Sequence, residues 1–190
     1  TVYSEQTIAK TRSKHCVEGF DLHVYPMTGI TENINGKWDC AIYSANMAPI
    51  SRGNLTLKKN DLLGQPKIDQ GYLNDSEDKD IEVLMEGLEL SREIAKQKEL
   101  SELIGKEILE TSKIVSLDDI RNSALHYYHP VGTCKMGPKS DVKAVVDNMG
   151  KVYGMDNLYV IDASIMPNIP RGNTNIPVAM VAERIVNTLD

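Results

Sequence analysis

The spacing of apolar residues changes period near residue 75, and this change limits the folds that the chain can adopt. Before that point, apolar and polar residues alternate at period two, which is typical of half-buried strands. After it, apolar residues return at three- and four-residue steps, which is typical of amphipathic helices. Strands followed by helices predict an α+β domain, in which the helices pack on one face of an antiparallel sheet.

The period-two segments predict three strands. Alternation over residues 19–26 gives the first strand, which is expected to end at its proline, and the apolar run 38–47 gives the second. The Asn- and Gly-rich segment 31–37 predicts a turn that joins these strands as an antiparallel hairpin. A shorter segment, 53–58, is expected to complete the sheet, and residues 60–69 are expected to form a loop.

The later segments predict mainly helices. A long amphipathic helix is expected over 78–98, after acidic residues that suit the positive end of a helix. A shorter helix follows over 100–108, and Ser116 predicts the cap of a third helix that ends near Leu125. Residues 158–161 form a short apolar run that predicts a buried strand, and a closing helix is expected from Pro177 to Leu189.

Composition and charge exclude several function classes. The chain has 190 residues, of which 41% are hydrophobic, and a net charge of −6. No Lys/Arg-rich run is present, so we expect no nucleic-acid binding, and no apolar stretch is long enough to predict a transmembrane segment. The chain does not begin with methionine, so it is expected to be a fragment, a processed product or a trimmed chain.

Cysteine usage bears on the cellular setting. The three cysteines, Cys16, Cys40 and Cys134, are odd in number and show no C-x-x-C spacing. This pattern argues against a disulfide framework or a zinc site. Because no signal peptide is visible either, we expect a reducing, cytoplasmic setting.

The last third of the chain contains the candidates for chemistry. His129 precedes a Gly-containing turn, and Asn173 and Asn175 stand near the start of the closing helix. Free amides and a positive dipole end at that position suit a negatively charged partner. From the residues alone, an interior histidine and plain helix caps remain the simpler explanations. His126 and His129 have a spacing that could ligate a metal on a helix, but no third ligand is near, so no metal site is expected.

Five segments of this region resemble, in order and spacing, the C-terminal sequence of the glucose–methanol–choline (GMC) oxidoreductases. The segments are His129–Gly137, Val145–Asp147, Val152–Gly154, Asn157–Pro167 and Gly172–Pro177. The chain most resembles the choline-dehydrogenase-like branch, which favours asparagine where other members have a second histidine. A weaker resemblance extends upstream through Ser51–Leu57 and Ile68–Leu73.

The resemblance implies an FAD-dependent enzyme that oxidises a small-molecule alcohol to a carbonyl. It assigns His129 as the base that takes the hydroxyl proton and Asn175 as its partner at the substrate oxygen. The hydride would pass to flavin N5, which is chemistry of the cofactor. The resemblance also implies that five residues contact the FAD, namely Asp162, Ala163, Asn175, Ile176 and Pro177.

The resemblance divides the chain into an irregular leader (1–18), a substrate-binding domain (19–150) and a C-terminal segment (151–190). The strand and helix of that last segment would return to the FAD-binding domain and complete it. The family's nucleotide-binding G-x-G-x-x-G fingerprint is absent from this sequence. We therefore expect an N-terminal FAD-binding portion or subunit as partner, and an inactive isolated chain.

Two other functions remain open at this stage. One is a non-catalytic binding or interaction domain from a truncated GMC protein. The other is a hydroxynitrile-lyase-type activity, which uses the same fold and histidine without net redox change.

Overall fold

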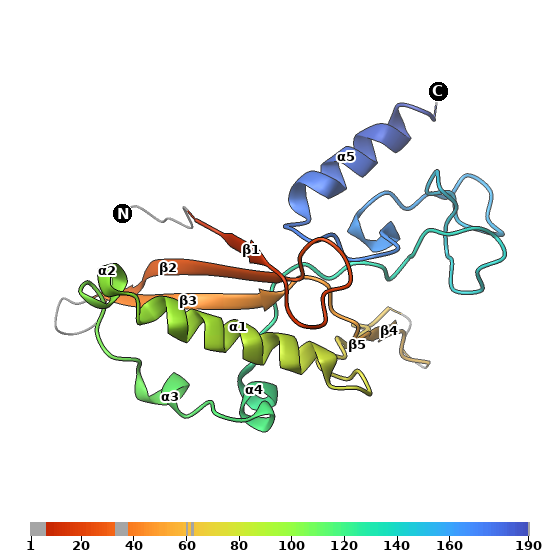
Figure 1. Cartoon of the computed structure of the whole chain (residues 1–190). Coiled ribbons are helices and arrows are strands. Elements are labelled where there is room, and N and C mark those ends of the chain that lie inside the picture. Colours follow the sequence, from red (N-terminus) through yellow and green to blue (C-terminus); the bar gives the residue numbers. More distant parts are fainter. Residues whose placement is uncertain (1–6, 33–37, 60, 62, 190) are drawn as a thin grey trace. The chain divides into compact units, whose positions relative to one another are not determined.

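The computed structural model forms two compact units, whose elements are labelled in Figure 1. It describes residues 7–32, 38–59, 61 and 63–189. The units consist of Thr1–Ser51 with Leu73–Leu125, and of Arg52–Tyr72 with His126–Asp190. Within the described ranges, none of the helices combines the length and the apolar character that a bilayer span requires.

A three-stranded antiparallel sheet lies at the centre of the first unit. Its strand order is β1-β2-β3, and the strands are β1 (Ala9–Thr11), β2 (Leu22–Glu32) and β3 (Trp38–Asn46). In the register, Leu22 lies opposite Thr11 on one side and Asn46 on the other. The predicted hairpin is therefore confirmed. Thr31 and Glu32 of the predicted turn belong to β2, and residues 33–37 lie outside the described residues.

Two expectations for this sheet were wrong. The first strand does not end at Pro26, which pairs with Ile42 of β3. Because β1 pairs with β2 only as far as Val24, Pro26 has a neighbouring strand on one side only, and proline is tolerated at such an edge. The third strand of the sheet is β1, which lies in the segment expected to be an irregular leader.

Helix α1 (Lys79–Ala95) packs on β2 and β3, as Figure 1 shows. Buried Val83 of the helix packs against Leu22 and Val24 of β2, with Ile42, Leu90 and Ile94 around them. Gly87 permits the close approach, because a Cβ atom there would lie 2.6 Å from the Cβ of Ser44. The predicted long helix and the α+β class are confirmed.

A buried carboxylate fixes the start of α1. The side chain of Asp80 accepts hydrogen bonds from the backbone amides of Ile50 (2.9 Å) and Ser51 (2.8 Å) and from the Asn46 amide group (3.0 Å). Asp80 is 3% exposed, and these bonds compensate the cost of burying its charge. They tie the helix to the chain that leaves β3.

The remaining helices of this unit are short. The helix expected over 100–108 is replaced by α2 (Lys98–Ser101) and α3 (Leu109–Ser112). Helix α4 (Leu117–Ser123) begins at the predicted cap, since Ser116 and Asp119 form a reciprocal capping box. The hydrogen bond that the Ser116 hydroxyl donates to the Asp119 carboxylate lowers the pKa of that carboxyl, with the Val115 amide adding to the effect.

The second unit begins with a separate two-stranded sheet. Strand β4 (Asn54–Thr56) pairs with β5 (Lys67–Asp69), with Leu55 opposite Ile68. The expectation that 53–58 would join the main sheet was therefore wrong, and so was the expectation of a loop through residue 69. The side chains of this three-residue strand are exposed, so no buried face specifies its partner. The tertiary structure decides which strand it pairs with.

The rest of the second unit is mostly irregular chain around a small core. Buried Val146, Ile165 and Ile185 form this core, and the half-buried residues packed on it are Met136, Val152, Val160, Ile161 and Val181. Over residues 126–189, regular structure is limited to isolated bridges, the 3-10 turn η1 (Ala163–Ile165) and helix α5 (Asn175–Val186). The buried strand predicted at 158–161 was wrong: Leu158 and Tyr159 are exposed, and a single bridge joins Tyr159 to Lys151.

Candidate active site

His129 is held at the start of α5, within the second unit. Its Nδ1 atom lies 2.9 Å from the hydroxyl oxygen of Thr174, the residue before the helix. Asn175, the predicted partner of His129, follows directly as the first residue of α5. The structure thus brings two segments that lie 45 positions apart in the sequence to one place.

The first turn of α5 begins without a side-chain cap. Thr174 is the N-cap residue, and its side chain accepts no hydrogen bond from the helix. The interpretation of Asn173 or Asn175 as the cap was therefore wrong. The helix also starts two residues before Pro177, whose missing amide still falls among the first unpaired groups. Asn175 and Ile176 are exposed, so the positive end of the helix carries an accessible amide side chain.

Backbone hydrogen bonds connect the chain after His129 to η1. The amide of Cys134 donates to the Ser164 carbonyl (2.9 Å), and the amide of Met136 donates to the Ile165 carbonyl (2.8 Å). Gly132, with a φ of 90°, makes the turn between His129 and these bonds. A side chain at this position would be strained, so the glycine sets the path of the loop.

The other predicted cofactor residues lie at η1. The Asp162 carboxylate accepts hydrogen bonds from the backbone amide and the hydroxyl of Ser164, and so caps this turn. Asp162 is exposed and Ala163 is half-buried. Through the bonds of Cys134 and Met136, η1 belongs to the same hydrogen-bonded framework as the loop after His129.

Aromatic rings flank the histidine on its own segment. Tyr127 meets the His129 ring edge to face at 5.7 Å, and His126 meets Tyr128 in the same way at 4.3 Å. Tyr128 has a φ of 62°, an unusual backbone conformation for a residue with a side chain. His126 and His129 therefore have different ring neighbours.

An ion pair stabilises the loop beyond Met136. The Lys135 ammonium lies 2.6 Å from the Asp141 carboxylate, and this contact lowers the pKa of Asp141. The Asp141 side chain also accepts from the Lys143 amide at 2.9 Å. This ion pair and this hydrogen bond therefore help to close the loop.

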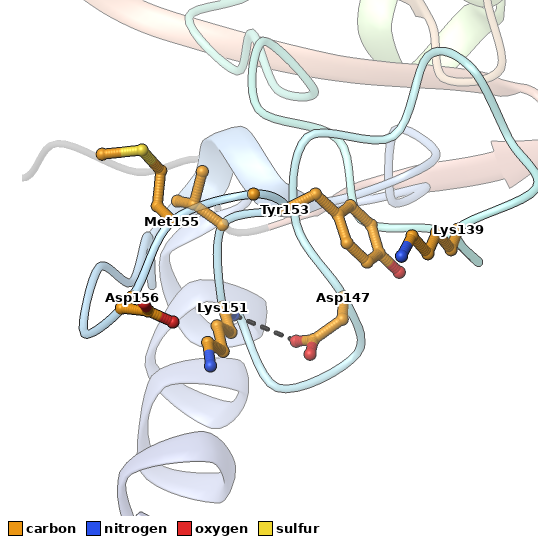
Figure 2. Close-up of a pocket in the computed structure, with 8 residues that line it drawn as sticks. Lys139, Asp147, Lys151, Tyr153, Met155 and Asp156 are labelled. Carbon is orange, nitrogen blue, oxygen red and sulfur yellow. Dashed lines mark hydrogen bonds between the residues drawn. The ribbon is translucent and has the colours of Figure 1, made fainter.

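A shallow pocket in the same unit does not contain the predicted site. Figure 2 shows its lining, with Asp147 accepting a hydrogen bond from the Lys151 amide at 3.0 Å. The remaining residues that line it are Lys139, Val152, Tyr153, Gly154, Met155 and Asp156. None of the predicted catalytic or cofactor residues is among them. In the part of the chain that the structure describes, no group of three His, Cys, Asp or Glu residues is placed to hold a metal.

Sequence reasoning missed Thr174. A threonine just before a helix is typical of an N-cap, and that pattern gave no reason to look for another partner. The only sequence signal was its position between the two asparagines of Asn173-Thr174-Asn175.

Comparison with known proteins identifies the family. Residues 49–182 match the family model of the C-terminal domain described as GMC oxidoreductase. Oxygen-dependent choline dehydrogenase 1 of Chromohalobacter salexigens is 40% identical over 146 residues, which cover 75% of this chain and 26% of that protein. The chain thus spans about a quarter of the length of this curated relative.

Solved structures agree with this assignment. Pyridoxine 4-oxidase from Mesorbium loti has a TM-score of 0.76 at 27% identity, covering 96% of this chain and 37% of that chain. An FAD-dependent oxidoreductase from Chaetomium thermophilum shares the fold, with a TM-score of 0.68 at 22% identity, covering 88% of this chain and 28% of that chain. The chain belongs to the GMC oxidoreductases and spans their C-terminal domain.

Proposed function

We propose that this chain is the C-terminal portion of an FAD-dependent oxidoreductase that oxidises an alcohol to a carbonyl. The observation that carries the proposal is the contact between His129 and the residue that precedes Asn175. In the proposal, His129 is the group that takes a proton, and Asn175, one residue beyond that contact, is the amide that holds an oxygen atom. The match to a family whose relatives include choline dehydrogenases supports the assignment.

His129 and Asn175 have complementary roles in the proposed reaction. An alcohol must lose its hydroxyl proton as its carbon loses a hydride, and a histidine is suited to accept that proton near neutral pH. Asn175 cannot ionise, but its amide can donate a hydrogen bond to the substrate oxygen as negative charge develops there. Its exposure leaves it free to do so.

The residues at α5 and η1 fit the flavin end of an FAD molecule. The uncapped start of α5 offers amides and a positive dipole end to an electron-rich edge, beside Asn175, Ile176 and Pro177. Asp162 and Ala163 would hold the cofactor at η1. FAD, when bound, supplies the hydride acceptor.

The proposal requires a second portion of protein. Because the sequence lacks the glycine-rich nucleotide fingerprint, an N-terminal FAD-binding portion or subunit would hold the dinucleotide. Residues 19–150 would bind substrate, and residues 151–190 would complete the FAD-binding domain. We expect the isolated chain to be inactive.

The unpaired state of Cys16, Cys40 and Cys134 supports a reducing, cytoplasmic setting.

Anaerobic titration of the protein that contains this chain, purified with FAD, tests the proposal. Choline and a neutral primary alcohol would each be added while flavin absorbance is followed. We expect bleaching by one of them. His129→Ala should slow bleaching by about 10²–10⁴-fold, the usual contribution of a general base.

His126→Ala is the matched control, since His126 lies three residues away, is exposed and contacts Tyr128 rather than Thr174. It should leave the rate within about threefold of wild type, because no proton transfer passes through it. Absence of bleaching would favour a non-catalytic domain. Cyanohydrin cleavage without bleaching would favour the lyase.

A further inference from the structure

The connection between β1 and β2 lies against helix α1 of the first unit, and its residues 12–19 are called the strap below (the red loop in Figure 1). We propose that the strap is a pH-sensitive device. It is held most tightly on α1 in mildly acidic solution, where His15 is charged and Glu82 is still ionised. The inference is independent of the proposed function, because no residue of the candidate active site belongs to the strap or to α1.

Hydrogen bonds at the base of the strap fix where it begins and ends. The amide and the hydroxyl of Ser13 donate to the Asp21 carboxylate, at 2.8 and 2.6 Å. Both residues are less than a tenth exposed, so water competes little for these bonds. The Arg12 guanidinium also donates to the Cys16 carbonyl, at 3.1 Å. The strap therefore has a defined shape, and its contacts with α1 decide whether it stays closed.

The contacts with α1 converge on neighbouring carboxylates of one helix face. His15 Nε2 and Lys14 Nζ lie 2.6 and 2.9 Å from the same oxygen, Oε2 of Glu82. One turn further along the helix, Glu86 accepts a hydrogen bond from the Lys14 amide at 3.0 Å. The side chains of His15 and Glu82 are 24% and 31% exposed, so solvent screens their contact less than that of a fully exposed pair.

The charges around this contact favour a proton on His15. On α1, three carboxylates act on Lys14, and they belong to Glu82, Glu86 and Glu89. The strap and its base contribute the remaining titratable and charged groups, which are Arg12, Lys14, Cys16, Glu18 and Asp21. The Asp21 carboxylate is already bonded to Ser13, and Arg12 to a carbonyl of the strap itself. Three carboxylates that meet one ammonium group leave an excess of negative charge, which an imidazolium at His15 reduces.

Two titrations of opposite sign give the pH dependence. A carboxylate only accepts, so His15 donates Nε2–H to Glu82 even when its ring is neutral. As the pH falls through about 6.5, a histidine becomes charged, and a charge-assisted hydrogen bond is stronger than a neutral one.

The second titration is that of Glu82. The hydrogen bonds from His15 and Lys14 lower the pKa of this carboxyl from its ordinary 4.5, so it remains ionised after the histidine has gained its charge. At lower pH the carboxylate takes up a proton, and the contact is lost. The closed strap is therefore most stable between the two titrations.

The strap also affects how firmly β1 is held. Strand β1 has three residues, and Thr11 is the last of them to pair with β2. Ser13 lies two residues further on, so the bonds of a closed strap continue the attachment of this short strand. An open strap would leave β1 easier to detach, and its detachment would expose an edge of β2.

Amide hydrogen exchange in the whole 190-residue chain, followed by NMR between about pH 4 and pH 8, tests the proposal. The Lys14 amide is the reporter, because its acceptor lies on α1. Each rate is divided into the intrinsic rate at the same pH to give a protection factor. Amides in the middle of α1 report unfolding of the whole unit and separate it from opening of the strap.

In wild type, the protection factor of Lys14 should rise about 2- to 5-fold from pH 8 to about pH 5.5, the size expected for a partly exposed ion pair. It should fall again toward pH 4. His15→Gln keeps a hydrogen-bond donor that cannot become charged, so it should remove the rise and keep the fall. Glu82→Gln should remove the rise and lower the protection factor at every pH.

Glu93→Gln is the matched control, since Glu93 lies on the same helix and pairs with Lys96 rather than with the strap. It should follow the wild-type curve. A rise that persists in His15→Gln, or a steady fall in wild type from pH 8 downward, would overturn the proposal. A Glu93→Gln curve that matches Glu82→Gln would also overturn it, because the charge of the helix as a whole would then set the exchange.

Discussion

The two units of the chain are built in different ways. In the first unit, long periodic elements pack an apolar helix stripe on an antiparallel sheet. In the second, short turns and bridges surround a core of three buried residues and are joined by bonds between backbone groups. The predicted site residues lie in the second unit. Irregular chain can present side chains and free amides in directions that a strand or helix does not offer, provided a framework holds it.

The largest expected effects come from the two cores. Ile165→Ala in the second unit should lower the free energy of unfolding by about 2–5 kcal/mol, as should Leu22→Ala in the first, since both side chains are at most 2% exposed. Differential scanning calorimetry would show whether the two substitutions lower the midpoint of the same unfolding transition. Separate transitions would sharpen the distinction between the units, and one shared transition would weaken it.

Substitution of Gly150 tests whether close contact between backbone segments stabilises the second unit. Its φ is 74°, and a Cβ there would lie 2.6 Å from the Val160 carbonyl oxygen. Gly150→Ala should lower the unfolding free energy by roughly 3 kcal/mol, from strain and a clash together.

The matched control is Gly154→Ala. Gly154 has a φ of 76°, and among the described residues no atom beyond Gly154 and its two chain neighbours lies within 4 Å of the added carbon. It should cost only about 1–2 kcal/mol of backbone strain. Equal losses in urea denaturation of the two variants would show that close packing at Gly150 is unimportant.

Asp80→Asn tests how much a buried, hydrogen-bonded carboxylate contributes to the stability of the first unit. Asp80→Asn removes the charge and replaces an accepting oxygen with a donor, so at least one of the hydrogen bonds that Asn46, Ile50 and Ser51 donate to this side chain is lost. We expect a loss of about 1–3 kcal/mol in unfolding free energy, measured by urea denaturation. An exposed carboxylate of the same helix, Glu93→Gln, should change it by less than about 0.5 kcal/mol. A loss no larger than that of the control would show that the Asp80 bonds do not anchor α1.

The smallest expected effect is on the pH dependence of folding stability, through His23 of β2. His23 is 2% exposed, and neither ring nitrogen has a partner among the described residues. Burial lowers its pKa from the ordinary 6.5, and the nearby Lys10 charge adds to this. Below pH 6.5 the unfolded chain binds a proton that the folded chain does not, so stability falls as the pH drops.

His23→Phe removes this titration and keeps the ring that stacks on Phe20. Thermal unfolding at pH 8 and pH 5 should show a smaller acid-induced decrease in the variant than in wild type. An identical decrease would mean that His23 does not contribute to the acid sensitivity of the first unit.

The sequence predicted the regular unit better than the irregular one. The hairpin and α1 were predicted because apolar residues such as Leu22, Val24 and Val83 repeat at the periods of their elements. Strand β1 was missed because three residues carry too little pattern, and its partner is set by tertiary pairing. The short β4 was found, but its pairing with β5 was not.

The candidate site was predicted in part. The motifs around His129 and Asn175 came from a family resemblance, and the roles of these residues remain predictions. The Thr174 contact joins distant segments through the tertiary fold, so local sequence patterns do not reveal it.

A double-mutant cycle tests most directly whether the two loop segments act as one site. The rate of flavin bleaching by alcohol would be measured anaerobically in wild type, Thr174→Val, His129→Gln and the double variant. The account predicts that Thr174→Val slows wild type but has no further effect once His129 is replaced. The same fold-loss in both backgrounds would show that Thr174 and His129 act independently, and would contradict the account.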